Sequence, residues 1–164
     1  MKMTSLKTLL FMLLVPGLLL VGLPHYLFQT DPALFFFGIF RWLAVPLWLI
    51  GAAGMTWCAW AFTVRGRGTP SPTDPPKELV ISGLYRIVRN PIYVCVVIFL
   101  IGHVLWHPAR SILWMPVIVA VSSHLFVTLY EEPHLRKSFG AKYEAYCSSV
   151  PRWLPRLRRQ PPSP

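Results

Sequence analysis

Charged residues are scarce in this 164-residue sequence, and acidic residues are the scarcest of them. Asp, Glu, Lys and Arg make up 13% of the chain, about half of the roughly 25% that a soluble domain carries. Six acidic residues stand against sixteen Lys and Arg, a formal net charge of +10. Since 54% of the residues are hydrophobic, this composition excludes an ordinary soluble globule. It favours anionic lipids over nucleic acid as the partner of the basic surface.

Cysteine is also scarce. The chain has three cysteines, which lie far apart and form no C-x-x-C motif: Cys58, Cys95 and Cys147. Neither a disulfide framework nor a zinc site follows from such spacing. His103 and His107 are one helical turn apart and His124 follows later, but no carboxylate accompanies them in the apolar stretches. We therefore expect no metal site.

Four long stretches contain no Asp, Glu, Lys or Arg. They lie between Lys7 and Asp31, between Arg41 and Arg65, between Arg89 and Arg110, and between Arg110 and Glu131, and they contain 23, 23, 20 and 20 residues. A helix needs about 20 apolar residues to span the hydrocarbon core of a bilayer. The pattern predicts about four transmembrane helices, near residues 6–28, 42–64, 91–106 and 112–130. The last two have a short connection and should form an antiparallel hairpin.

The basic residues predict how these helices are oriented. Fourteen Lys and Arg lie in the first seven residues, between the second and third predicted helices, and after the fourth, whereas only Arg41 and Arg110 lie elsewhere. Basic residues concentrate on the cytoplasmic side, so we expect a multi-pass protein of an inner membrane or an endomembrane with both termini cytoplasmic. A signal peptide at the start is the alternative, but no A-x-A-like cleavage site follows the first apolar run.

Two polar segments remain, and both are expected on the cytoplasmic side of a single domain over residues 1–164. Residues 65–93 begin with a run of Gly and Pro, which excludes a regular helix or a central strand there. Residues 131–155 contain apolar side chains at spacings of four, four and three, at Leu135, Phe139, Tyr143 and Tyr146. This spacing predicts an amphipathic C-terminal helix, which Gly140 should weaken by roughly 1 kcal/mol relative to Ala.

Glu131 and Glu132 directly follow the fourth apolar stretch, near the level of the lipid headgroups. Carboxylates at this depth need a partner, because burying a charge there is costly. One interpretation is an ion pair with Arg86, Arg89 or Lys137. The other is a cationic ligand.

These segments together resemble a known enzyme family. The matching residues are Thr69-Pro70, then Leu79-Val80-x-x-Gly83-x-Tyr85-x-x-x-Arg89-x-Pro91-x-Tyr93, then Glu131-Glu132-x-x-Leu135-x-x-x-Phe139-Gly140-x-x-Tyr143-x-x-Tyr146, then Val150-Pro151-Arg152. Over residues 51–155 the chain resembles the isoprenylcysteine carboxyl methyltransferase family and its phospholipid methyltransferase relatives. The resemblance implies an all-α integral membrane bundle with a cytoplasmic cofactor-binding loop, and S-adenosylmethionine as cofactor.

The resemblance also implies a set of site residues. It assigns cofactor binding to Lys77, Glu78, Leu79, Val80, Tyr85, Asn90, Pro91, Ile92, Tyr93 and Glu131. Asn90 stands where the family usually has His, and Asn keeps a donor and an acceptor but cannot become a cation. Arg89 and Arg152, which we group with Glu131 as catalytic, can hold an acceptor carboxylate because the planar guanidinium matches it.

The expected reaction is methylation of the carboxylate of an isoprenylcysteine-like or other lipophilic acceptor that arrives from the bilayer. A carboxyl group is already ionised at pH 7 and needs no base. Three alternatives remain at this stage: N-methylation of a phospholipid amine, a sterol-reductase-like enzyme, and a membrane scaffold without catalysis.

Overall fold

The computed structural model describes residues 17–64 and 78–155, and the regular elements of this part of the chain are all helices. In chain order they are η1 (Leu18–Gly22), α2 (Leu23–Thr30), η2 (Gly38–Leu43), α3 (Ala44–Val64), η3 (Gly83–Arg86), α4 (Pro91–Trp106), α5 (Arg110–Phe126), η4 (Val127–Glu131), α6 (Glu132–Phe139) and α7 (Ala141–Ser149), where η marks π and 3₁₀ segments. The predicted all-α class is confirmed.

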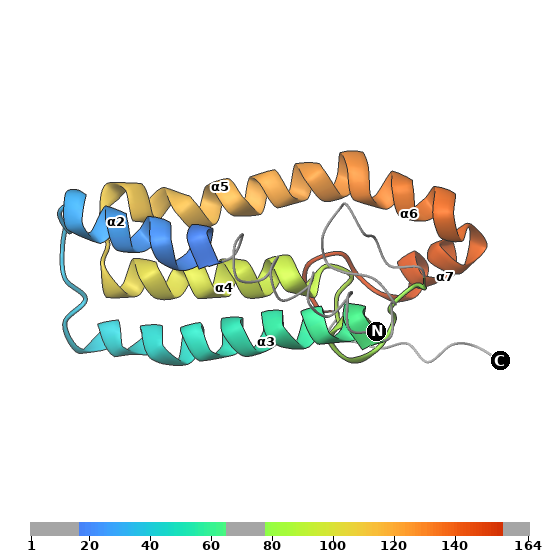
Figure 1. Cartoon of the computed structure of the whole chain (residues 1–164), viewed down its shortest axis with the longest axis horizontal. Coiled ribbons are helices and arrows are strands. Elements are labelled where there is room, and N and C mark those ends of the chain that lie inside the picture. Colours follow the sequence, from blue (N-terminus) through green and yellow to red (C-terminus); the bar gives the residue numbers. More distant parts are fainter. Residues whose placement is uncertain (1–16, 65–77, 156–164) are drawn as a thin grey trace.

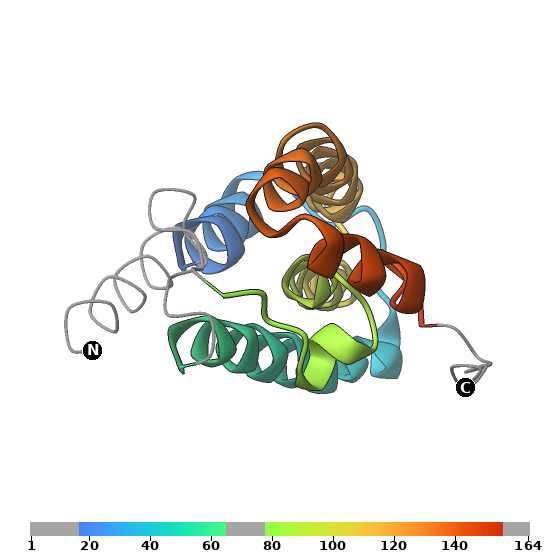
Figure 2. The same cartoon turned by 90° about the vertical axis from the view of Figure 1, so that its right-hand side faces the viewer.

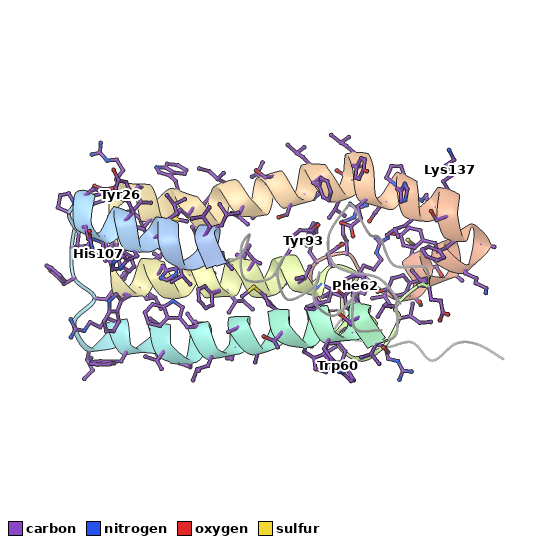
Figure 3. All side chains as sticks on the ribbon, viewed as in Figure 1. Tyr26, Trp60, Phe62, Tyr93, His107 and Lys137 are labelled. Carbon is purple, nitrogen blue, oxygen red and sulfur yellow. The ribbon has the colours of Figure 1, made fainter. Side chains whose placement is uncertain are left out.

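The long helices lie side by side, with α4 between α3 and α5 (Figures 1 and 2). The predicted hairpin of α4 and α5 is confirmed, since only residues 107–109 separate the two helices and they pack together. We call the end of the bundle formed by residues 31–43 and 107–111 the connection end. The opposite end, formed by residues 78–93 and 127–155, we call the site end. Tyr93 and Phe62 lie toward the site end and His107 lies at the connection end (Figure 3).

Helices α3 and α4 pack closely because glycine lines their contact. A Cβ atom added at Gly51 would lie 2.8 Å from the Cys95 carbonyl oxygen and 2.8 Å from Cβ of Phe99. A Cβ atom at Gly54 would collide with the Cys95 thiol. Small residues allow helix backbones to approach closely in membrane bundles, so the small-residue face around Gly51 explains why α3 lies against α4.

Two π turns interrupt the helices, and each is followed two residues later by proline. Pro24 follows η1 and Pro133 follows η4. Proline has no N–H for the carbonyl four residues earlier, so the usual helical bonding fails there and a wider turn forms. In η1 the freed carbonyl of Leu20 accepts a hydrogen bond from Nε2 of His103 at 2.7 Å. In η4 the Glu132 N–H bonds to the carbonyl of Val127, five residues earlier.

Two helices in the described part are long and apolar enough to cross a membrane, Gly38–Val64 and Arg110–Phe139. The prediction of four is therefore only partly supported. The first predicted span, 6–28, begins outside the described residues, and its described part contains the π turn of η1. The third corresponds to α4, whose sixteen residues reach about 24 Å at 1.5 Å per residue. Pro91 at its start and Pro108 after its end limit this length.

The predicted C-terminal helix is wrong as a single element, because Gly140 divides it into α6 and α7. Gly140 has φ of +52° and ψ of −128°, a conformation that residues with a Cβ rarely adopt. The apolar positions nevertheless come together: Leu135, Phe139, Tyr143, Tyr146 and Cys147 pack with Leu79 and Val150. Tyr143 and Tyr146 are buried, so this face contacts protein, whereas plain membrane anchoring would leave it exposed.

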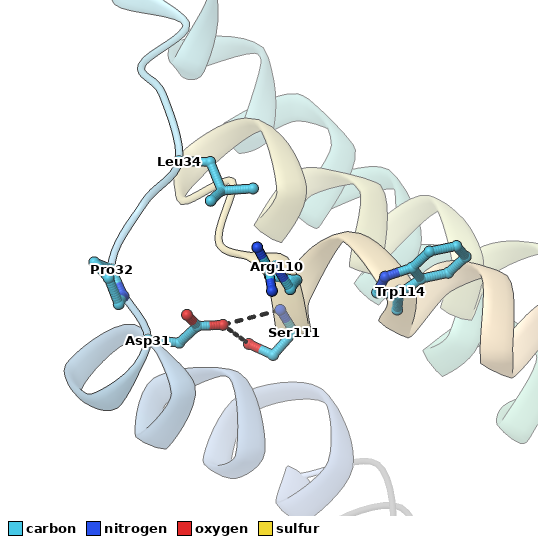
Figure 4. A pocket seen from close by; sticks show the side chains of 6 residues that line it. All are labelled: Asp31, Pro32, Leu34, Arg110, Ser111 and Trp114. Carbon is cyan, nitrogen blue, oxygen red and sulfur yellow. Dashed lines mark hydrogen bonds between the residues drawn. The ribbon is translucent and has the colours of Figure 1, made fainter.

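At the connection end, Asp31 caps the start of α5 from outside that helix. Ala109, the residue before α5, has no side-chain acceptor for the first N–H groups. The Asp31 carboxylate accepts the Ser111 N–H at 2.9 Å and the Ser111 hydroxyl at 2.6 Å (Figure 4). These bonds lower the pKa of Asp31, the hydroxyl contributing most. A surface pocket adjoins this cap, with Arg110 and Trp114 in its lining.

Candidate active site

A phenol and a carboxylate meet where α4 begins and η4 ends. Tyr93, in the first turn of α4, donates its hydroxyl hydrogen to Oε2 of Glu131 at 3.0 Å. Glu131 is partly buried. Among the described residues, no cation forms an ion pair with its carboxylate. Glu131 therefore keeps acceptor capacity, and no cation of residues 17–64 or 78–155 neutralises its carboxylate.

The neighbouring Glu132 is in the opposite situation. Arg152 holds it with two parallel hydrogen bonds, from Nε at 2.7 Å and from Nη2 at 2.9 Å, and Arg89 adds an ion pair at 3.2 Å. Glu132 is only 3% exposed, and the bond to its carboxylate raises the pKa of Arg152. Charge-assisted bidentate pairs are strong and geometrically specific, so Glu132 ties the last described segment to the start of α4.

Backbone contacts place the same segments next to each other. The Arg89 N–H donates to the carbonyl of Pro151 at 2.8 Å, and the side-chain amide of Asn90 donates to the carbonyl of Arg152 at 3.3 Å. Nη1 of Arg89 also donates to the Cys147 sulfur at 2.6 Å. Asn90, the residue where the family usually has His, thus uses its donor within the protein to hold residues 151–152 in position.

Tyr85, in η3, also belongs to the site end. Its ring is buried and packs against Phe62 at 5.5 Å between ring centres, while its carbonyl accepts the Tyr146 hydroxyl at 2.6 Å. Burial raises the pKa of Tyr85, with smaller contributions from the Cys58 thiol and from the negative charge of Glu131.

Several buried polar atoms at this end have no hydrogen-bond partner among the described residues. They are the Tyr85 hydroxyl, Oγ of Ser82 and Nε of Arg89. Buried polar atoms are normally satisfied, and exceptions call for an explanation. These atoms and the Glu131 carboxylate all belong to the site end, which thus offers hydroxyl, cationic and carboxylate groups to a ligand that is itself charged and polar.

The structure brings together five of the residues that the sequence predicted: Arg89, Asn90, Tyr93, Glu131 and Arg152. Lys77 lies outside the described residues. Glu78 is exposed, whereas Leu79, Val80, Pro91 and Ile92 are at least partly buried and Leu79, Val80 and Ile92 pack in hydrophobic clusters. If these apolar residues contact a ligand, they must do so while they remain packed in the hydrophobic clusters.

Sequence reasoning missed one pairing and two residues. Glu132 was considered for an ion pair with Arg86, Arg89 or Lys137, and it does pair with Arg89, but the bidentate partner Arg152 was assigned only to an acceptor. Trp153 and His124, which hydrogen-bond to each other at 3.1 Å, were not predicted to interact. The one feature of the sequence that could have indicated a role for Trp153 is its position between two prolines, Pro151 and Pro155.

Comparison with known proteins decides the family. The phospholipid methyltransferase family matches residues 39–142, which include α3, α4, α5 and the carboxylate pair. The chain belongs to the phospholipid methyltransferase family. No curated protein and no solved structure matches the chain. Family membership makes this chain a membrane methyltransferase, and the two long apolar helices agree with the membrane assignment.

Methyltransferases of the phospholipid methyltransferase family generally use S-adenosylmethionine. The groups at the site end fit such a molecule chemically. Its sulfonium and ammonium suit the Glu131 carboxylate, which has no cationic partner among the described residues. Its ribose hydroxyls suit the Tyr85 hydroxyl, which has no hydrogen-bond partner in the same part of the chain.

Proposed function

We propose that this membrane methyltransferase uses S-adenosylmethionine to methylate the carboxylate of a lipophilic, isoprenylcysteine-like acceptor. The observation that carries the proposal is the contrast between adjacent glutamates. Glu132 is neutralised by Arg89 and Arg152, while Glu131 has, among the described residues, the Tyr93 hydroxyl and no cation. A partly buried carboxylate without a cation is a suitable partner for a cationic ligand.

In this proposal the chain's own residues bind and orient the reactants. Glu131 and Tyr93 take the cationic part of the cofactor, and the Tyr85 hydroxyl takes a neighbouring polar group. When bound, the cofactor supplies a methyl group on a sulfonium that an oxygen nucleophile attacks in line. Alignment of the two reactants is the main requirement of such a displacement, which agrees with the bonds that hold residues 89–93 against residues 150–153.

In this proposal Arg89 and Arg152 supply the positive charge that faces the carboxylate of the methyl acceptor. Glu132 occupies Nε and Nη2 of Arg152 and meets Arg89 at Nη1, so Nε of Arg89 remains among the donors that can reach an acceptor oxyanion. An ionised carboxylate needs no general base. The carboxylate therefore requires only donors, which this end of the bundle provides.

N-methylation of a phospholipid amine is the second candidate, because the matching family is named for phospholipids. An amine must lose a proton before it attacks. His134, the histidine beside the glutamates, is exposed and stacks on Tyr130 at 6.2 Å. N-methylation would use His134 as its general base.

The proposal includes a topology with four membrane crossings and both termini in the cytoplasm, supported by the division of fourteen basic residues against two. The polar cofactor then reaches the site end from the cytoplasm, and the acceptor reaches it from the bilayer. Thiol labelling of Pro72→Cys, Ala109→Cys and Ser163→Cys tests this. Labelling of the Ala109 position from the cytoplasmic side would contradict it.

A turnover assay with methyl-labelled cofactor tests the reaction. We expect methylation of a prenylated or acylated carboxylate, little methylation of its lipid-free analogue, and none of a phosphatidylethanolamine. Equal turnover of the lipidated and lipid-free carboxylates would exclude supply of the acceptor from the bilayer. Turnover of the amine alone would replace the proposal with the second candidate.

A further inference from the structure

Trp153, which follows α7, and His124, near the end of α5, form a polar contact on the exposed surface of the bundle. The indole N–H of Trp153 donates to Nδ1 of His124 at 3.1 Å. The Trp153 ring also packs edge-on against Tyr93, with 6.3 Å between ring centres. Since Tyr93 bonds to Glu131, His124 is linked through one indole ring to the proposed cofactor site.

The depth of His124 makes its polar side chain notable. It lies seven residues before Glu131 on the continuous helix Arg110–Phe139, about 10 Å along the helix axis. His124 is exposed on the surface of the bundle, so in a membrane it faces lipid or a molecule that arrives through lipid. Ionisable residues within a spanning helix are costly and most often functional.

Trp153 determines which ring nitrogen of His124 carries the hydrogen. An indole nitrogen is a donor only, so Nδ1 of His124 must be the acceptor and must be bare. In the neutral ring the hydrogen then lies on Nε2, and the doubly protonated ring cannot form this bond. Among the described residues Nε2 of His124 has no hydrogen-bond partner. The contact therefore leaves a neutral histidine with one unused donor.

We propose that His124 binds the anionic group of the methyl acceptor through its Nε2–H, and that Trp153 is a positioning residue that holds the ring in this tautomer. The inference rests on the proposed function and names a residue that contacts the carboxylate of its lipophilic acceptor. While the bond to Trp153 persists, Nε2 cannot accept a proton, so His124 cannot serve as the base that an amine acceptor would need.

Steady-state kinetics with the full chain in lipid nanodiscs test the binding role. For a lipophilic carboxylate, His124→Leu should raise KM about tenfold to a hundredfold, the range for a lost hydrogen bond to a charged group. The affinity for S-adenosylhomocysteine should stay unchanged. His124→Gln, which retains an N–H donor, should recover part of the loss. His25→Leu, at an exposed histidine on α2, is the matched control. An unchanged KM in His124→Leu would overturn the proposal.

Trp153→Phe tests the positioning role separately, because it keeps a ring against Tyr93 but removes the N–H. The His124 ring can then adopt either neutral tautomer, so KM for the lipophilic carboxylate should rise while kcat and the affinity for S-adenosylhomocysteine stay unchanged. Trp114→Phe, an exposed tryptophan at the other end of α5, should leave KM unchanged. An unchanged KM in Trp153→Phe would show that Trp153 does not hold the tautomer.

Nitrogen-15 NMR of labelled histidine makes this inference testable apart from turnover. The His124 signals, assigned by their loss in His124→Gln, should report a bare Nδ1 and a protonated Nε2, and the Nε2 signal should shift when the lipophilic carboxylate is added. A reversed tautomer, or no shift on addition, would overturn the inference. If the shift occurs but no carboxylate is methylated, the proposed reaction fails while the binding role of His124 stands.

Discussion

The two ends of the bundle hold carboxylates in contrasting ways. At the connection end Asp31 accepts two hydrogen bonds from Ser111 and so completes the start of α5. At the site end Glu131 accepts one hydrogen bond from Tyr93 and, within the described residues, has no cationic partner. The first carboxylate is used by the fold. The second keeps its charge available, which is the arrangement expected where a cationic ligand binds.

The arginines differ in the same way. At the connection end the Arg41 guanidinium lies over two neighbouring indole rings, 5.4 Å from the centre of Trp42 and 5.1 Å from that of Trp106. At the site end Arg89 and Arg152 converge on the buried Glu132. Cation–π contact anchors a charge at a membrane interface, whereas the ion-pair cluster joins segments distant in the sequence. The following changes separate these structural roles from the ligand-binding role of Glu131.

Removal of the Glu132 carboxylate should have the largest effect. Glu132→Ala leaves Arg89 and Arg152 without their partner, and loss of one member of a buried ion pair costs about 3–5 kcal/mol. Thermal unfolding in detergent should show this loss. Glu144→Ala is the matched control, because its pair with Arg136 is about half exposed and exposed pairs contribute about 0–1 kcal/mol. Equal losses in the two variants would mean that the cluster does not stabilise the site end.

A substitution at Gly140 should have the next largest effect, and with the sign opposite to that expected from helix propensity. Propensity predicts that Ala stabilises a helix there, whereas the observed positive φ predicts that Gly140→Ala destabilises the protein by about 1–3 kcal/mol. No atom would lie within 4 Å of the added Cβ, so backbone strain alone is responsible. A higher melting temperature in Gly140→Ala would show that α6 and α7 form one helix.

Loss of the Tyr146 hydroxyl should have a moderate effect. Tyr146→Phe removes the bond to the Tyr85 carbonyl, and a neutral hydrogen bond contributes about 0.5–1.5 kcal/mol. Urea or thermal unfolding measures the change. Tyr26→Phe, at an exposed tyrosine of α2, should be neutral, and a loss of similar size there would remove the distinction between the two ends.

The smallest effect concerns the pH dependence at the connection end. The Ser111 hydroxyl and N–H lower the pKa of Asp31, so the bonds to Asp31 stabilise the fold at every pH above the usual carboxyl pKa. This stabilisation is lost as pH falls through the lowered value. Between pH 7 and pH 3 the melting temperature should fall less in Asp31→Asn than in the unaltered protein. Coincident pH profiles would show that Asp31 does not contribute through its charge.

Much of this contrast between the ends could be predicted from the sequence, because charge gaps locate helices in an apolar chain. The gap between Arg89 and Arg110 predicted residues 91–106, the extent of α4. The hairpin then placed Tyr93 near Glu131, and these side chains do meet. The glycines around Gly51 explain the close contact of α3 with α4, since small residues have a packing role that depends little on distant parts of the chain.

The rest depended on geometry that spacing does not encode. The apolar spacing from Leu135 to Tyr146 continues across Gly140, so the positive φ that divides α6 from α7 left no sign in the pattern. The pairing of Arg152 with Glu132 requires the chain to turn back after α7, which depends on that same break. The π turns before Pro24 and Pro133 arise because proline has no N–H to donate. Hydrophobic periodicity does not show how this missing hydrogen bond changes the helix register.

Calorimetric titration of the purified protein with S-adenosylhomocysteine tests most directly whether Glu131 serves a ligand while Asp31 serves the fold. The unaltered protein should bind, and Glu131→Gln should bind about tenfold to a hundredfold more weakly, since a hydrogen bond to a charged group contributes roughly 1.5–3 kcal/mol. Asp31→Asn should bind as the unaltered protein does. Equal affinity in Glu131→Gln and the unaltered protein, or equal losses in the two variants, would contradict this account.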